Sequence, residues 1–93
     1  QLNRMNSRYL PAISLHTNIT PTTDVQEALK NQLILEAIPM VFLRSVLHRI
    51  APYHTDEHFW VALTKGIEIN TLLLATQVIE DVLAVSPNRI AVL

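Results

Sequence analysis

The chain has no cysteine, and it has a single glycine, Gly66, among its 93 residues. Without thiols it forms neither disulfide bonds nor a zinc site built on thiolates. One glycine also excludes a glycine-rich phosphate-binding loop, because such loops need several glycines where the backbone approaches a nucleotide. We therefore expect no cofactor, and the missing cysteines indicate no particular compartment.

A strong charge of one sign and a long hydrophobic run are missing as well. Seven basic and eight acidic residues give a formal net charge of -1, so the chain lacks the positive field with which proteins attract nucleic acid. The longest strongly apolar run, residues 33–43, covers about eleven residues, whereas a membrane-spanning helix needs about twenty. These absences argue against a nucleic-acid partner and against a membrane span.

Apolar residues are abundant for a chain of this length. They make up 49% of the sequence, while a domain of this size buries only roughly 60 to 65% of the surface that its unfolded chain exposes. We expect one domain that forms a homo-oligomer or binds another protein chain. The alternative is a monomer with a well-filled helical core. Because the sequence starts with Gln1 and ends in the apolar residues 90–93, we also expect a domain excised from a longer protein.

Residues 1–23 predict an extended arm or linker, and residues 24–93 predict a helical bundle domain. Pro11 interrupts any helix in the arm, and apolar residues alternate with polar ones from Ile13 to Ile19, as they do in a strand. A lone strand leaves its edges unpaired. We therefore expect the arm to lie on the helices or to pair with a partner strand.

The apolar run at residues 33–43 predicts the middle of a long helix. Thr23 and Gln26 have the spacing of a capping box, so the helix begins near Asp24. On a helical wheel the apolar stripe continues in phase through Pro39 to Ile50. We predict one helix over residues 24–51, kinked at Pro39. The alternative is that Pro39 begins a second helix.

A second apolar patch lies on this predicted helix, in a sector that is polar before and after it. Its members are Ile34, Ala37, Ile38 and Val41. A small domain has little material to cover a helix that is apolar on both sides. We predict that the patch contacts a partner chain, with Trp60 as a second anchor. The alternative is that the N-terminal arm covers it.

Glu36 is a possible buried polar residue, because it falls on the predicted core face of the helix. An unpaired buried carboxylate is costly, so we expect an Arg or His partner on a neighbouring helix, or exposure at the kink. Two alternatives give it a function. It acts chemically in a pocket, or it is the polar contact of a small apolar ligand in a helical regulatory domain.

His54, Glu57 and His58 form an HxxEH motif. In zinc peptidases with this motif, two histidines on one helix face bind the metal and the glutamate is the general base. Here Thr55 indicates the start of a helix, which places His54 outside it and removes the required geometry. We predict no metal site and retain a metal-dependent hydrolase as the alternative function.

Two further helices are predicted over residues 56–65 and 68–85, because the apolar stripe changes face near Gly66. The alternative is one bent helix over the same residues. The predicted fold is all-α, a small antiparallel helical bundle with a long Pro-kinked helix and an extended N-terminal arm. The predicted function is a protein-protein interaction or oligomerisation module, which forms a dimer or another homo-oligomer or docks on another protein chain. We expect no enzyme and no catalytic residues.

Overall fold

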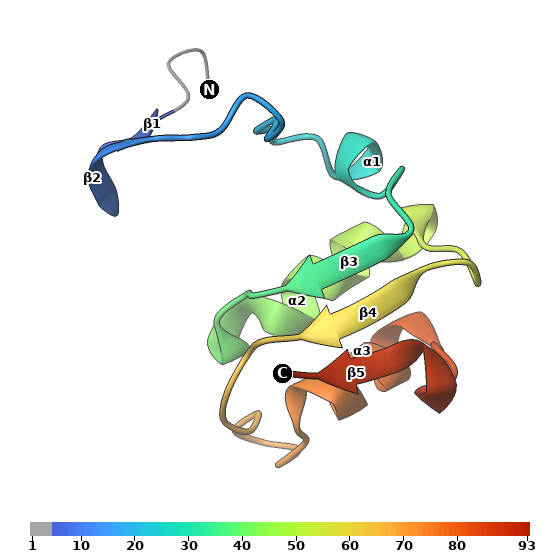
Figure 1. Cartoon of the computed structure of the whole chain (residues 1–93). Coiled ribbons are helices and arrows are strands. Elements are labelled where there is room, and N and C mark those ends of the chain that lie inside the picture. Colours follow the sequence, from blue (N-terminus) through green and yellow to red (C-terminus); the bar gives the residue numbers. More distant parts are fainter. Residues whose placement is uncertain (1–4) are drawn as a thin grey trace.

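A computed structural model describes residues 5–93, and Figure 1 shows an α/β domain preceded by an N-terminal arm. The arm contains strands β1 (Met5–Asn6) and β2 (Leu10–Ser14) and the single-turn helix α1 (Val25–Ala28). The domain alternates strands and helices in the order β3 (Leu33–Glu36), α2 (Met40–Ile50), β4 (Phe59–Ala62), α3 (Ala75–Leu83) and β5 (Ile90–Val92). Short 3-10 helices η1 (Ala51–Tyr53) and η2 (Pro87–Arg89) precede β4 and β5.

The three strands of the domain form one parallel sheet with the order β3-β4-β5. Each connection between neighbouring strands is a helix, so the domain is a single βαβαβ unit. Helices α2 and α3 pack against each other on one face of the sheet, as Figure 1 shows. The β1–β2 hairpin is antiparallel and extends away from the sheet.

The all-α prediction is wrong, and the error begins at the apolar run. Residues 33–36 form strand β3, so the predicted helix over residues 24–51 does not exist as one element. The strands of parallel sheets are usually buried, so their sequences are continuous apolar runs. Periodicity alone does not distinguish such a run from a segment of a buried helix. The alternative was closer to the structure, because Pro39 is the N-cap residue of α2.

The second half of the chain corrects the prediction in the same way. The predicted helix over residues 56–65 is replaced by strand β4, whose aromatic and β-branched residues favour a pleated strand. The predicted helix over residues 68–85 is shortened to α3, preceded by a loop. Gly66, which follows β4, has a φ of 95°. This left-handed conformation is one that glycine adopts without steric cost.

The hydrophobic core lies between the sheet and the two helices. Its largest fully buried side chains are Trp60, Leu43, Leu47, Ile79 and Val78. The opposite face of the sheet is open, because Leu33, Leu35 and Phe59 are 60%, 61% and 42% exposed. Alternation between buried and exposed residues along β4 therefore follows the strand period of two. Within residues 5–93, no helix combines the length and hydropathy needed to cross a bilayer.

Candidate functional site at the carboxyl edge of the sheet

The carboxyl ends of the parallel strands meet at one edge of the sheet. The segment after β3 (residues 37–39) leads into α2, and the segment after β4 (residues 63–66) leads into the loop before α3. In open parallel sheets, ligands bind in the crevice outside this edge. Side chains in these two segments are therefore the candidates for a functional role.

A buried carboxylate joins the two segments. Glu36, at the end of β3, is only 2% exposed. Its Oε1 accepts hydrogen bonds from the Ile38 backbone N–H at 2.6 Å and from the Thr64 hydroxyl at 2.5 Å. The Thr64 hydroxyl also lies 2.6 Å from the Ile38 carbonyl oxygen, its second acceptor. The end of β3 and the segment after β4 are thus bound together by side chains.

The partner of Glu36 differs from the one predicted. The sequence suggested an Arg or His from a neighbouring helix, whereas the structure supplies a hydroxyl and a backbone amide. Glu36 Oε2 is buried and has no hydrogen-bond partner within residues 5–93. The carboxylate therefore keeps one free acceptor oxygen inside the protein.

Lys65 places a positive charge at this edge. It directly follows Thr64, and its side chain is exposed. The ion pairs of the described residues are made by Lys30 and Arg44, so the Lys65 ammonium is not engaged by a carboxylate there. An exposed, unengaged ammonium is available to an anionic ligand.

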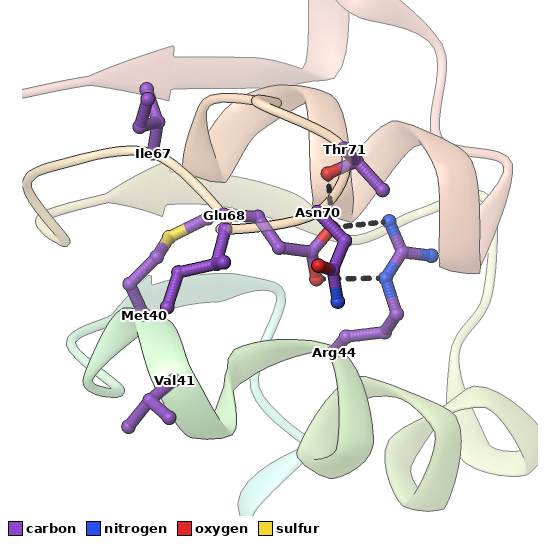
Figure 2. Close-up of a pocket in the computed structure, with 8 residues that line it drawn as sticks. Met40, Val41, Arg44, Ile67, Glu68, Asn70 and Thr71 are labelled. Carbon is purple, nitrogen blue, oxygen red and sulfur yellow. Dashed lines mark hydrogen bonds and ion pairs between the residues drawn. The ribbon is translucent and has the colours of Figure 1, made fainter.

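A pocket of about 540 Å³ lies beside the same edge, and Figure 2 shows residues that line it. The first turns of α2 contribute one wall through Met40, Val41 and Arg44, and the loop after β4 contributes the other through residues 67–71. The Arg44 guanidinium donates from Nε and Nη2 to the two carboxylate oxygens of Glu68, both at 2.9 Å. Such two-point pairing fixes geometry as well as charge. Arg44 therefore ties the loop to α2.

Two further residues, Asp81 and Thr71, join the Arg44–Glu68 pair in a cluster. Arg44 Nη1 donates to Asp81 on α3 at 2.6 Å, and Thr71 donates its hydroxyl proton to Glu68 at 2.5 Å. The hydrogen bonds from Arg44, and after them the one from Thr71, lower the pKa of Glu68 to about 2. The same carboxylates raise the pKa of Arg44. The loop before α3 is thus held by charges that persist at moderately acid pH.

This shift predicts an acid-dependent stability. Because the folded-state pKa of Glu68 lies below its ordinary value of 4.5, its contribution is present above pH 4.5 and is lost as the pH falls toward 2. We expect Glu68→Gln to melt below the wild type at pH 6, with the difference shrinking between pH 4.5 and 2. Thermal melts followed by circular dichroism across this range check it. A difference that stays constant down to pH 2 contradicts the assignment.

The HxxEH residues lie at the opposite, amino edge of the sheet and on no helix. His58 Nδ1 accepts from the Thr55 backbone N–H at 3.0 Å, so its Nε2 carries the proton that is donated to the Leu29 carbonyl at 2.7 Å. Both ring nitrogens of His58 are occupied, and neither has a lone pair left for a metal. Within residues 5–93, no group of three potential ligands has metal-binding geometry.

His54 and Trp60 pack beside His58. The His54 ring lies 5.5 Å from that of His58 and 6.0 Å from that of Trp60, centroid to centroid. Burial, and after it the neighbouring His58, lowers the pKa of His54. This environment favours a neutral imidazole in an aromatic cluster. Glu57, the proposed general base, is exposed, and the arrangement supports packing rather than metal-dependent hydrolysis.

The predicted interaction residues are distributed over two places. Ile34, Ala37, Ile38 and Trp60 line a second pocket of about 300 Å³ along the outer edge of β3, together with Glu36. Val41 lies apart from them, in the wall of the larger pocket, and is 76% exposed. Trp60 is 1% exposed and belongs to the core. Association with a second copy or with another protein chain stays a prediction.

The sequence prediction gave no functional role to Thr64 or Lys65. Their signal was present, because polar residues that directly follow a buried strand mark the ligand-binding edge of a parallel sheet. A helix over residues 56–65 hides this signal, because Thr64 and Lys65 are ordinary last-turn residues on such a helix.

A model of the family described as the N-terminus of NAD-dependent glycerol-3-phosphate dehydrogenase matches residues 1–93. The chain belongs to this family. Curated relatives include the glycerol-3-phosphate dehydrogenase [NAD(P)+] of Frankia casuarinae, 41% identical over 90 residues, which are 96% of this chain and 27% of that protein. The protein of the same name from Bacillus subtilis is 36% identical over 83 residues, 86% of this chain and 24% of that protein.

The fold agrees with a solved structure of the same class of enzyme. The crystal structure of glycerol-3-phosphate dehydrogenase from Coxiella burnetii superposes with a TM-score of 0.87 at 25% identity, over 99% of this chain and 28% of that one. The chain therefore spans about a quarter of the length of these relatives. Its α/β fold is that of the matching part of the Coxiella burnetii enzyme.

Family membership corrects the functional predictions. The interaction or oligomerisation module and the helical regulatory domain are wrong, since the matched family consists of dehydrogenases and the fold is α/β. The expectation of no enzyme is wrong for the same reason. The metal-dependent hydrolase is also wrong, because the comparisons identify an oxidoreductase family and the HxxEH residues are engaged in packing.

Proposed function

We propose that this chain contributes to the coenzyme domain of a dehydrogenase that oxidises glycerol 3-phosphate with NAD+ or NADP+. The observation that carries this proposal is the family match over residues 1–93. It is supported by relatives of that name at about 40% identity and by the superposition on the Coxiella burnetii enzyme. The activity belongs to the complete gene product, of which this chain supplies one part.

The topology indicates which part. Doubly wound dinucleotide-binding folds consist of two βαβαβ halves, and the glycine-rich pyrophosphate loop follows the first strand of one half. This chain has one βαβαβ unit and a single glycine, so it corresponds to the half without that loop. The coenzyme lies at the carboxyl edge where the two halves meet. The outer edge of β3, which lacks a neighbouring strand within residues 5–93, is the side on which the other half would join.

The residues at the carboxyl edge fit part of a dinucleotide site. Among the described residues, no side chain caps the N-terminus of helix α2, and the first N–H groups of a helix favour negative charge. Lys65 adds an exposed ammonium after β4. We assign Lys65 to contact an anionic group of the substrate or coenzyme. When bound, the nicotinamide supplies the hydride acceptor, and this chain supplies a rigid edge and positive charge.

A turnover assay of the complete gene product tests the proposal. We expect reduction of NAD+ or NADP+ in the presence of glycerol 3-phosphate, and no reduction with glycerol, because the phosphate is needed for recognition. The isolated 93-residue chain is the matched control, and it should give no turnover because it has no pyrophosphate loop. Absence of turnover with glycerol 3-phosphate and both coenzymes would reject this function.

A further inference from the structure

The segment that carries Lys65 is fixed on both sides. On the strand side, the Leu63 backbone N–H donates to the Glu36 carbonyl at 2.8 Å, which extends the β3–β4 pairing past the end of β4. The Thr64 side chain adds its contacts to the Glu36 carboxylate and the Ile38 carbonyl. On the other side, Gly66 turns the chain with its left-handed backbone. Lys65 lies between a doubly bound residue and a turn.

Burying a carboxylate at the end of β3 costs desolvation free energy. Glu36 is 2% exposed at the edge of an apolar core, and its Oε2 has no partner within residues 5–93. An apolar side chain would avoid the desolvation cost at such a position. What the carboxylate provides is one oxygen that accepts from two different segments, Ile38 ahead of α2 and Thr64 ahead of Lys65.

We propose that Glu36 and Thr64 are positioning residues for Lys65. Through the shared Oε1 they fix the backbone of the segment after β4 relative to the start of α2. The two sources of positive potential at this edge, the Lys65 ammonium and the α2 N-terminus, thereby keep a set separation. The inference rests on the proposed function for the role of Lys65, but the positioning itself is a property of the chain.

Thr64→Val tests the inference because it removes the hydroxyl while keeping the branched shape. In the complete gene product we expect kcat/KM for glycerol 3-phosphate to fall roughly 10- to 100-fold, the scale of a small misplacement of a functional group. Thr64→Ser keeps the hydroxyl and should restore most of the activity. Glu36→Gln keeps an acceptor oxygen and should lose less than Glu36→Leu.

A double variant separates positioning from a general structural role. If Thr64 acts through Lys65, Thr64→Val should cost little more once Lys65 is already replaced by methionine, so the two effects should not multiply. Effects that multiply, or a Thr64→Ser enzyme as impaired as Thr64→Val, would overturn the inference.

A second readout does not depend on activity. Cleavage by trypsin after Lys65, measured by mass spectrometry on the folded complete gene product, should be faster in Thr64→Val than in Thr64→Ser, because the variant no longer holds the segment after β4. Cleavage after Lys30 is the internal control and should not change. If both variants are cleaved after Lys65 at the wild-type rate, the inference fails.

If turnover is absent but the cleavage rates differ as expected, the proposed function fails and the positioning stands. If Thr64→Val does not fold, the Glu36→Gln and Glu36→Leu pair gives the same comparison.

Discussion

Replacing Trp60 by alanine is expected to lower the free energy of unfolding by about 3 to 5 kcal/mol, the usual cost of deleting a large buried aromatic side chain. Trp60 is 1% exposed and packs in the core between the sheet and the helices. Small domains have about 5 to 15 kcal/mol in total, so the variant should be close to unfolding. Urea denaturation followed by far-ultraviolet circular dichroism measures the change in the 93-residue chain.

Phe59→Ala is the matched control for this loss. Phe59 is the preceding residue on β4, but it lies on the open face of the sheet and is 42% exposed, with the Arg89 guanidinium 4.6 Å from its ring centroid. We expect it to cost about 1 kcal/mol or less, the scale of a cation–π contact at an exposed site. Equal losses for the two variants would contradict the strand assignment, since alternation of faces is what separates them.

Replacing Lys65 by methionine is expected to lower kcat/KM for glycerol 3-phosphate about 100-fold in the complete gene product, the scale reported for losing one electrostatic contact in a closed site. Methionine keeps the length and apolar character of the side chain and removes its charge. Because Lys65 is exposed and unpaired by the carboxylates within residues 5–93, its replacement should leave the thermal midpoint nearly unchanged. Steady-state kinetics with both coenzymes provide the measurement.

The control for Lys65→Met is Lys30→Met. Lys30 is also exposed, but it pairs with Glu27 at 2.8 Å near α1, away from the carboxyl edge. Its replacement should leave the kinetics as they are. Lys65→Met activity equal to that of Lys30→Met would remove Lys65 from the site.

Part of the fold was readable from the sequence through residues with strong backbone preferences. Pro39 marks a real boundary, because α2 begins immediately after it, and Gly66 marks a turn with positive φ. The helical periodicity of residues 40–50 reports a true amphipathic helix with Leu43, Leu47 and Ile50 buried. These signals are local, so the predictions made from them are correct even though the predicted overall topology is wrong.

The strands were not readable in this way, because their signal depends on partners distant in sequence. β3 has four residues and pairs with β4, whose first residue lies 26 positions after that of β3 by the register Leu33↔Phe59. A short apolar run fits a strand or a buried helix equally well, and only its partners decide. On the predicted helix, Glu36 is a charged residue on the core face with no evident partner. In the sheet it is the residue at which one strand ends and the site begins.

The candidate site could not be predicted from the sequence for the same reason. Thr64 and Lys65 acquire significance only when β4 runs parallel to β3 and ends beside it. The HxxEH motif lies at the amino edge of the sheet, opposite the candidate site. Its residues contribute to packing and to a turn. The lack of further glycines was the most informative absence in the sequence. It excludes the pyrophosphate loop from this chain, and the same absence indicates which half of a dinucleotide fold the chain represents.

Hydrogen exchange on the complete gene product, with and without NADH and glycerol 3-phosphate, is the most direct test that the carboxyl edge faces the coenzyme and substrate. The account predicts slower exchange on ligand binding in residues 37–41 and 63–67, and unchanged exchange at the amino edge around His54 and His58. Protection confined to the amino edge, or no change in either carboxyl-edge segment while ligand binds, would contradict it.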